Sequence, residues 1–357
     1  MSTTVNVGMI GCGGIAMGKH LPSLAKIPEV RITAFFDVAW DRANEAKQKF
    51  GTPDAKIYDN VNDLLRDPDV QVVHVCTPND THAEISIAAL EAGKHVLCEK
   101  PMAKTAADAR RMLETAERTG KKLSIAYQNR YRRDSLWLKE AARAGELGEI
   151  YLAKAHAVRR RAVPTWGVFL DKEKQGGGPL IDIGTHALDL ALWMMDNYEP
   201  RTVLGTSYRK LAEQGSQANE WGSWDPSQFT VEDSAFAMIT MKNGATIWLE
   251  SSWALNTLDV DEAKVTLCGT KAGADMKGGL RINGEEHGRL YTKEVQLGSV
   301  WDNSVPNDAP EKEARAWIDA ILHDREPVVT AKQALVVQQI LEAIYESADK
   351  GQAISFE

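Results

Sequence analysis

The chain has 357 residues, of which 43% are hydrophobic and 26% charged, a composition that excludes a disordered or collagen-like protein. At about 150 residues per domain, this length predicts two domains, which can fold without disulfides or structural metals. Lys and Arg number 42 and Asp and Glu number 50, so the net charge is −8. This balance argues against a nucleic acid or an anionic membrane as the main partner.

The cysteines indicate the redox setting of the protein. Four are present, at Cys12, Cys76, Cys98 and Cys268, and none belongs to a CxxC pair. We therefore expect neither a disulfide framework nor a cysteine zinc site, and we expect a reducing compartment. There is no uncharged apolar run of about 18 residues, and the first residues lack the basic segment of a secretory signal. These features predict a cytoplasmic protein.

The first third of the chain alternates short β-rich runs with longer amphipathic ones, which is the pattern of a buried parallel sheet. Strands are expected at 5–10, 30–36, 70–76, 95–98 and 123–126. Helices are expected at about 14–26, 41–50, 62–66, 82–92 and 105–119. The alternation predicts an α/β class protein whose residues 1–126 form a Rossmann dinucleotide-binding domain.

Residues 127–357 have a different pattern, which predicts a second, α+β domain. A long apolar helix is expected near 178–196, and Asn243-Gly244 marks a hairpin between strands at 234–241 and 245–253. Asn283-Gly284 marks another hairpin. The remaining expected elements are a surface loop at 211–229 and helices at about 310–323 and 331–349, the last ended by Gly351.

A glycine-rich turn, Gly11-Cys12-Gly13-Gly14-Ile15-Ala16, follows the first strand and opens a helix. Gly11 would make the tight turn, Gly13 would let backbone N–H groups approach a pyrophosphate, and Ala16 would let helix and strand pack closely. The string alone is a weak signal, but its position between a strand and a helix favours a dinucleotide-binding turn. We expect cofactor contacts from Gly11, Gly13, Gly14 and Ile15.

Asp37 ends the second strand, about 20 residues beyond these glycines. A carboxylate there accepts hydrogen bonds from the adenosine ribose hydroxyls and repels a 2′-phosphate, so NAD is favoured over NADP as cofactor. Arg42 would lie on the adenine or, if the loop folds back, meet a 2′-phosphate. The alternative is a glycine turn followed by an Asp that merely flanks a helix.

Two later strands end in polar residues, and ligands of open α/β sheets bind beyond the carboxyl ends of strands. Further cofactor contacts are therefore expected from Thr77, Pro78, Asn79, His82, Glu99 and Lys100. His82 alone is equally consistent with a surface residue at a helix start. Glu99-Lys100-Pro101 alone is equally consistent with a surface turn. Cys98 is expected to pack as a small apolar side chain.

Asp182 and His186 follow three glycines at 176–178 and lie four residues apart, so a helix would place them on one face. An apolar stripe adjoins them, formed by Ile181, Leu188, Leu192 and Met195. The glycines would let the helix start approach a ligand closely. A surface hydrogen bond between the two side chains is the simpler alternative. No third ligand and no HExxH string accompanies the pair, so we predict no metal site.

Taken in order, GCGGIA, Asp37, CTPNDTH, CEKP and the glycine-rich segment with Asp182 and His186 resemble the Gfo/Idh/MocA family of oxidoreductases over essentially the whole chain. The resemblance implies a Rossmann domain followed by a domain with a large, mostly antiparallel sheet. It implies that Lys100, Asp182 and His186 are the catalytic residues and contact the substrate. It also implies homodimers or homotetramers assembled through the face of that sheet.

The strings around Tyr127-Gln128, Arg159 and Trp166 are similar to the branch that oxidises the C3 hydroxyl of glucosides. This similarity implies substrate contacts from Tyr127, Arg159 and Trp166 and a cofactor contact from Gln128. Trp166 is a sugar-stacking platform or a buried anchor of the second domain. The arginines at 159–161 are a solvated strand edge or a subunit contact, although one would reach a substrate hydroxyl.

The expected function is NAD-dependent hydride transfer between nicotinamide and a secondary hydroxyl, C3 of a glucoside or free pyranose. Either His186 or Lys100 serves as the base, and the sequence does not rank them. The alternatives are a cyclitol dehydrogenase, an NAD-dependent glycoside hydrolase that oxidises C3 transiently, and a nucleotide-sensing regulatory protein.

Overall fold

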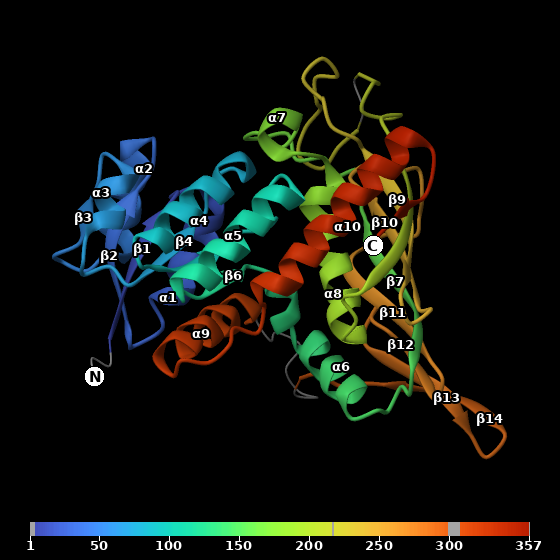
Figure 1. Cartoon of the computed structure of the whole chain (residues 1–357). Coiled ribbons are helices and arrows are strands. Elements are labelled where there is room, and N and C mark those ends of the chain that lie inside the picture. The colour runs from blue at the N-terminus through green and yellow to red at the C-terminus, as the bar shows by residue number, and fades with distance from the viewer. Residues whose placement is uncertain (1–3, 216–217, 299–307, 357) are drawn as a thin grey trace. The chain divides into compact units, whose positions relative to one another are not determined.

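The computed structural model describes residues 4–215, 218–298 and 308–356. Two compact units make up the chain, the first from residues 1–128 and 308–335 and the second from 129–307 and 336–357. Each unit contains one large sheet, and the α/β class is confirmed (Figure 1).

The first unit is built on a six-stranded sheet in the order β3-β2-β1-β4-β5-β6, with every neighbouring pair parallel. Its strands are β1 (Val5–Ile10), β2 (Val30–Phe36), β3 (Lys56–Ile57), β4 (Val72–Val75), β5 (His95–Cys98) and β6 (Leu123–Ile125). The five expected strands are confirmed. Strand β3 was not predicted, because two residues are too few to display a period.

Helices connect these strands as a doubly wound fold requires. They are η1 (Ala16–His20), α1 (Leu21–Leu24), α2 (Trp40–Phe50), α3 (Val61–Arg66), η2 (Asn79–Thr81), α4 (His82–Glu91) and α5 (Ala106–Thr119). The later helix α9 (Ala309–Leu322) belongs to the same unit but connects none of its strands. The helix ends follow local rules: the Thr105 side chain accepts a hydrogen bond from the Asp108 N–H at the start of α5, and Gly120 ends it in the left-handed conformation.

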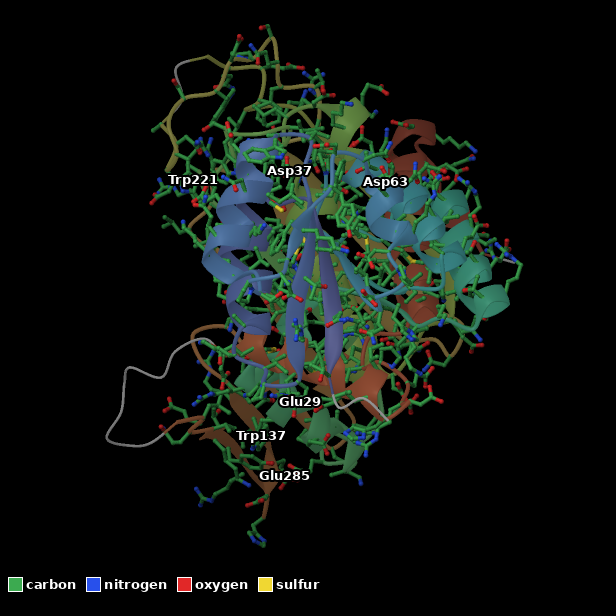
Figure 2. The ribbon with its side chains drawn as sticks, turned by 90° about the vertical axis from the view of Figure 1, so that its left-hand side faces the viewer. Glu29, Asp37, Asp63, Trp137, Trp221 and Glu285 are labelled. Atoms are coloured by element: carbon green, nitrogen blue, oxygen red, sulfur yellow. The ribbon has the colours of Figure 1, made fainter. Side chains whose placement is uncertain are left out.

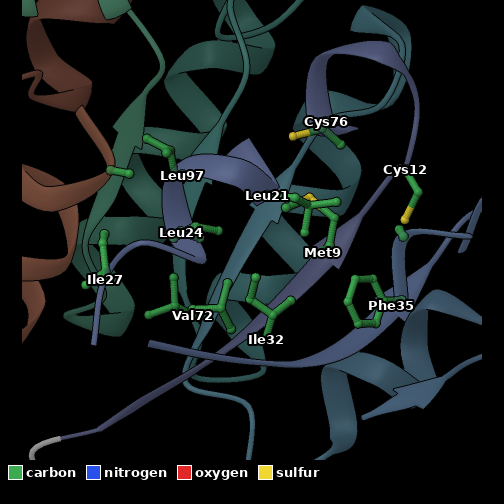
Figure 3. Close-up of a cluster of buried hydrophobic side chains, with 14 of the residues drawn as sticks. Met9, Cys12, Leu21, Leu24, Ile27, Ile32, Phe35, Val72, Cys76 and Leu97 are labelled. Atoms are coloured by element: carbon green, nitrogen blue, oxygen red, sulfur yellow. The ribbon is translucent and has the colours of Figure 1, made fainter. Parts of the chain in front are cut away.

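Buried side chains of β1, β2 and α1 form the core of this unit, among them Met9, Leu21 and Phe35 (Figure 3). Trp317 and Ile318 of α9 belong to the same cluster. This burial of an apolar helix face places residues 308–335 in the first unit. The structural units therefore differ in this segment from the division at 126/127 that we expected from the sequence.

The second unit contains a nine-stranded sheet in the order β14-β13-β12-β11-β7-β10-β9-β8-β15. Its neighbours are antiparallel except for β7 and β10, which confirms a large, mostly antiparallel sheet. The strands are β7 (Ile150–Val158), β8 (Pro200–Tyr208), β9 (Ser234–Met241), β10 (Thr246–Ser252), β11 (Asp261–Gly269), β12 (Ala272–Asp275), β13 (Arg281–Glu286), β14 (Arg289–Glu294) and β15 (Ile354–Ser355).

One face of this sheet is buried and the other is not, as the alternation along β10 shows. Ile247 and Leu249 are fully buried, whereas Trp248 between them is 43% exposed. Helix α8 packs on the sheet at β7 and β11 (Figure 1). The helices of this unit are α6 (Arg133–Arg143), α7 (Lys172–Gln175), η4 (Leu180–Gly184) and α8 (Thr185–Met195), while η3 (Gln128–Tyr131) and α10 (Ala331–Lys350) each contribute residues to both units.

The two expected hairpins have different outcomes. Asn243-Gly244 turns the chain between β9 and β10, and Gly244 has a φ of +91°. The prediction for Asn283-Gly284 is wrong, because both residues lie inside β13 and the turn falls at His287-Gly288, each with positive φ. A Cβ on Gly284 would come 2.5 Å from the hydroxyl of its cross-strand neighbour, Tyr291, so a larger residue there would displace the Tyr291 side chain.

The expected loop at 211–229 contains no helix or strand among its described residues, and residues 216–217 lie outside them. It is not wholly a surface loop. Trp224 is 5% exposed and Phe229 is fully buried. The Trp224 indole N–H donates to the Ala212 carbonyl at 3.1 Å, so these aromatic rings anchor the loop to the second unit.

Candidate active site

The loops with the expected cofactor residues meet at the carboxyl edge of the first sheet. Backbone hydrogen bonds of 2.8–2.9 Å join each loop start to the neighbouring strand end, from Gly11 to Phe36, Cys76 to Ile10, Glu99 to Val75 and Ala126 to Cys98. Figure 2 shows Asp37 at this edge and Glu29 at the opposite end of β2. The structure thus brings the predicted cofactor residues of the first unit to one edge, as the fold rule requires.

The glycine turn has one closed side and one open side. Gly11 has a φ of +86°, and a Cβ on it would lie 2.6 Å from the Cys76 carbonyl oxygen, so glycine is required. A Cβ on Gly13 or Gly14 would meet no atom within 4 Å. The neighbouring Ile15 is 42% exposed. Backbone here is open to a ligand at a helix start, which fits the pyrophosphate of a dinucleotide.

Asp37 supports the glycine turn in addition to its expected role. Its carboxylate accepts the Cys12 N–H at 2.7 Å and the Ala39 N–H at 2.8 Å, one bond on each oxygen. Each carboxylate oxygen has a further lone pair for a ribose hydroxyl. Arg42 is exposed in the first turn of α2, so both of its expected positions stay open.

His82 links two loops instead of lying on the surface. Its ring nitrogens bond the Pro101 carbonyl at 2.8 Å and the Thr77 carbonyl at 2.9 Å, and the side chain has no exposed area. Burial lowers the pKa of His82, and the two carbonyl groups oppose that shift. The interpretation as a surface residue at a helix start is therefore wrong. The structure gives His82 a supporting role behind Thr77 and shows no surface for direct cofactor contact.

Glu99 is the hub of a buried network that the sequence analysis missed. Its Oε1 contacts Lys19 Nζ at 3.0 Å and His20 Nε2 at 2.7 Å, and its Oε2 accepts the Lys100 N–H at 3.1 Å. Burial alone would raise the pKa of Glu99, but Lys19 and His20 hold it well below its usual value. Glu99 is 6% exposed, so it fixes the backbone of the half-buried Lys100 rather than offering its carboxylate to solvent.

The same network extends to two other elements. Lys19 Nζ lies 2.9 Å from Glu313 Oε2 of α9, and His20 Nδ1 lies 3.0 Å from His74 Nδ1 of β4. Burial lowers the pKa of His74 well below its usual value, and nearby His20 adds to the shift. Lys19 and His20 follow the glycine turn, and two adjacent basic residues in that helix are the one signal that the sequence offered.

In the second unit, Glu232 holds the segment that leads into Asp182. Its carboxylate accepts the N–H of Gly178 at 2.8 Å, the N–H of Leu180 at 3.1 Å and the hydroxyl of Tyr345 at 2.8 Å. A Cβ on Gly178 would lie 2.3 Å from the Glu232 carbonyl oxygen. Gly178 therefore allows close packing within the protein, while the close approach of a ligand to this helix start stays a prediction.

Asp182 lies in the π-helical turn η4, and His186 lies in the first turn of α8. The Asp182 carboxylate accepts the indole N–H of Trp253 at 3.0 Å, and Trp253 is fully buried. Asp182 is half-buried and His186 is 8% exposed. A π-helical turn is a frequent feature of functional sites, and here it carries one of the two predicted catalytic residues of this unit.

Arg159 and Trp166 lie on loops next to each other in the second unit. Two nitrogens of Arg159 bond the Glu262 carboxylate at 2.6 and 2.9 Å, and its guanidinium lies 5.4 Å from the ring of Trp221. Trp166 is 51% exposed, so its interpretation as a buried anchor is wrong. Its ring packs edge-to-face on Trp221 and Phe169, at 4.9 and 5.8 Å between centroids.

Two predicted residues follow β6, and an unpredicted ion pair involves Arg130 just beyond them. Tyr127 is 1% exposed, and Gln128 is half-buried at the start of η3. Arg130 forms a fully buried ion pair with Asp189 of α8, at 2.9 and 2.6 Å. This pair was not predicted because its members are distant in the chain.

Several other features bear on the chemistry of the described residues. Cys12, Cys76 and Cys98 are buried free thiols, and burial raises the pKa of Cys12 to about 12, which makes it a poor nucleophile.

Within the described part of the chain, no group of His, Cys, Asp and Glu is arranged to hold a metal ion. No helix found there has the length and apolar character needed to cross a bilayer.

Comparison with known proteins agrees with this geometry. A family model described as "Oxidoreductase family, NAD-binding Rossmann fold" matches residues 5–127, and a model of the C-terminal α/β domain of the same family matches residues 139–356. The chain belongs to the Gfo/Idh/MocA family of oxidoreductases. Membership in the Gfo/Idh/MocA family makes NAD the cofactor of the first unit, whose open glycine turn and Asp37 fit it.

Individual members of the Gfo/Idh/MocA family are also similar to the chain. The D-glucoside 3-dehydrogenase of Escherichia coli is 36% identical over 98% of this chain and 97% of its own. The inositol 2-dehydrogenase of Salmonella typhimurium is 33% identical over 56% of this chain and 57% of its own. A levoglucosan dehydrogenase, solved in complex with NADH and levoglucosan, shares the fold with a TM-score of 0.83 at 23% identity, over 99% of both chains.

Proposed function

We propose that this NAD-dependent oxidoreductase oxidises the C3 hydroxyl of a glucoside or free pyranose, or reduces the 3-keto sugar in reverse. The observation that carries the proposal is its 36% identity over 98% of the chain with a D-glucoside 3-dehydrogenase. The chain keeps Lys100, Asp182 and His186, and Asp182 is held by a buried indole N–H. A half-buried carboxylate of this kind suits a sugar hydroxyl as its partner.

The first unit supplies the cofactor contacts in this proposal. The backbone at Gly11, Gly13, Gly14 and Ile15 would hold the pyrophosphate, and Asp37 would bind the ribose. Thr77, Pro78, Asn79 and Gln128 would line the rest of the cofactor site, with His82 and Glu99 supporting the loops behind it. NAD, when bound, supplies the nicotinamide C4 that accepts a hydride.

The protein's own side chains manage the proton and the orientation of the sugar. Oxidation of a secondary alcohol breaks an O–H bond and a C–H bond. The proton of the O–H bond needs a base, and the hydride of the C–H bond needs the cofactor as its acceptor. We assign His186 as base, Lys100 as hydrogen-bond donor to the reacting oxygen, and Asp182 as the clamp on a neighbouring hydroxyl. Lys100 as base is the alternative. Tyr127, Arg159 and Trp166 complete the proposed surroundings of the substrate.

The test incubates the purified protein with NAD and, separately, glucose, methyl β-glucoside and myo-inositol. The near-ultraviolet band of reduced nicotinamide is followed, and the sugar product is identified. A 3-keto product from glucose or the glucoside supports the proposal. Turnover of inositol alone would overturn it in favour of the cyclitol dehydrogenase, which the similarity to an inositol 2-dehydrogenase favours as second candidate.

A glycoside hydrolase and a nucleotide-sensing protein would each give a distinct result in the same experiment. A hydrolase that oxidises C3 transiently would release the aglycone without accumulation of reduced cofactor. A nucleotide-sensing protein would bind NAD and turn over none of the sugars. The presence of Lys100, Asp182 and His186 together argues against the sensing function.

We also propose that the protein forms homodimers or homotetramers through the open face of its second sheet. Leu204, Met238 and Trp248 are adjacent across β8, β9 and β10, and each is 39–46% exposed. Apolar side chains in a row on a sheet face are typical of an interface. We place the protein in the cytoplasm, which its free cysteines support.

A further inference from the structure

A chain of aromatic rings leads from Asp182 toward the surface of the second unit. The first ring is Trp253, whose indole N–H donates to the Asp182 carboxylate at 3.0 Å. Phe169 packs edge-to-face on Trp253 at 6.3 Å, and Trp166 packs edge-to-face on Phe169 at 5.8 Å. Trp221 follows at 4.9 Å from Trp166. The two outer tryptophans are thus connected to a predicted catalytic residue by direct ring contacts.

The rings at the outer end of this chain are the exposed ones. Trp253 is fully buried, whereas Trp166 is 51% and Trp221 is 41% exposed. Two adjacent, half-exposed indoles form a continuous apolar surface, and such a surface is typical of a place where a ligand or partner packs. We refer to Trp166 and Trp221 together as the indole pair.

The loops that carry the indole pair are fixed to each other. Asn219 accepts the Val163 N–H at 2.8 Å and donates to the Val163 carbonyl at 2.9 Å. The Thr165 hydroxyl donates to the Trp221 carbonyl at 2.6 Å. Such cross-links order the pair before a ligand arrives, which lowers the entropy cost of binding.

Arg159 adds a further constraint on the same pair. Its guanidinium is locked by two hydrogen bonds to Glu262 and lies 5.4 Å from the centroid of the Trp221 ring. Glu262 satisfies two of the Arg159 nitrogens, so we assign this arginine to holding Trp221 in addition to any contact with a substrate hydroxyl.

From these contacts we infer that the indole pair is an aglycone subsite, which binds the second ring of a glucoside while the glucosyl ring lies at Asp182. The inference rests on the proposed function, because Asp182 marks the position of the reacting sugar. The subsite takes a ring with an apolar face, either an aryl aglycone or a second pyranose. Indole faces stack on both, since each presents C–H groups or a π-system to the ring.

The test compares kcat/KM for phenyl and methyl glucosides, each anomer against its own methyl reference, with cellobiose as the disaccharide. For at least one ringed substrate, the wild-type protein should exceed its methyl reference by about tenfold, the worth of one aromatic stack. A preference for the phenyl compounds assigns the subsite to aryl aglycones, and a preference for cellobiose assigns it to a second sugar.

Variants of the indole pair then locate the effect. Trp221→Ala and Trp166→Ala should each bring the ratio of ringed to methyl substrate toward one, while Trp221→Phe should retain most of it. The ratio is measured within each variant, so a general loss of activity or stability does not alter its meaning. Trp137→Ala is the matched control, since Trp137 is 37% exposed and Figure 2 shows it at the opposite end of the second unit from Trp221.

The possible failures are separable. Equal kcat/KM for ringed and methyl substrates in the wild-type protein would overturn the subsite, and so would a wild-type ratio in both alanine variants. Oxidation of methyl glucoside in those cases leaves the proposed function standing. If no glucoside is oxidised at all, the proposed function fails and the subsite fails with it.

Discussion

Lys19 and Glu99 form a buried ion pair, with 3.0 Å between Nζ and Oε1, across 80 residues of sequence. Lys19 lies in the helix that follows the glycine turn, and Glu99 bonds the backbone N–H of Lys100. One ion pair therefore joins the helix behind the predicted pyrophosphate site to the loop that carries a predicted catalytic residue. We therefore interpret Glu99 as a residue that holds Lys100 in place and does not itself contact the substrate.

Glu99→Gln should destabilise the protein strongly, because it leaves the buried Lys19 with a weaker set of partners. Breaking one side of a buried pair costs about 3–5 kcal/mol of unfolding free energy, measured by urea denaturation. The matched control is Glu311→Gln, which removes one partner of the exposed Lys26–Glu311 pair and should change stability little. Equal effects of the two variants would show that the Glu99 network contributes no special stability.

His186→Ala and Lys100→Ala should each lower turnover by on the order of 100-fold or more, since each removes a group proposed for proton transfer or for stabilising the reacting oxygen. NAD binding, followed by calorimetry, should change little in His186→Ala. Wild-type turnover in both variants would rule out the proposed catalytic set. The pH profile of the residual activity in each variant would identify which of the two is the base.

Asp37→Ser should shift cofactor preference from NAD toward NADP by on the order of tenfold in kcat/KM, because it removes a ribose acceptor and a charge that repels a 2′-phosphate. Loss of the bonds to Cys12 and Ala39 should also lower thermal stability. The double variant Asp37→Ser with Arg42→Ala distinguishes the two expected positions of Arg42, on the adenine or at the 2′-phosphate. Loss of the NADP gain in the double variant places Arg42 at the 2′-phosphate, and an unchanged gain excludes it from that role.

Acidification from pH 7 to pH 5.5 should lower the unfolding free energy through His74. Burial depresses the folded-state pKa of His74 well below 6.5, so the unfolded chain binds a proton in this range that the folded chain does not. Stability from this group is complete above pH 6.5 and decreases below it by about 1.4 kcal/mol per pH unit. His74→Gln should reduce the slope, whereas His323→Gln, an exposed control, should leave it unchanged. An identical slope in both variants would contradict the assignment.

Trp248→Lys together with Met238→Lys should convert an oligomer into monomers, because two charges would be buried at the proposed interface. Light scattering coupled to size-exclusion chromatography measures the mass. Leu258→Lys is the control, since Leu258 is 85% exposed and lies outside the strands of the sheet. A wild-type protein that is already monomeric would refute the interface.

Much of the fold was predictable from the sequence, because its signals are local. A short, mostly apolar strand, the turn at Gly11 and Asp37 at the next strand end all occur within short windows. The Asn243-Gly244 hairpin followed from the same kind of signal. The same dipeptide at Asn283-Gly284 does not form a turn, because both residues pair with β14 inside β13 and the turn falls at His287-Gly288. A dipeptide alone does not report what lies opposite it.

Spacing within single segments was enough to predict the domain types, the family resemblance and the candidate residues Lys100, Asp182 and His186. Folding in three dimensions was needed to show that α9 belongs to the first unit, that Glu99 pairs with Lys19, and that Trp253 donates to Asp182. Each of these pairings joins residues some 70 or more positions apart. Such partners meet through burial and hydrogen bonding in the folded chain, and contacts of this kind leave no signal in the local periodicity of the sequence.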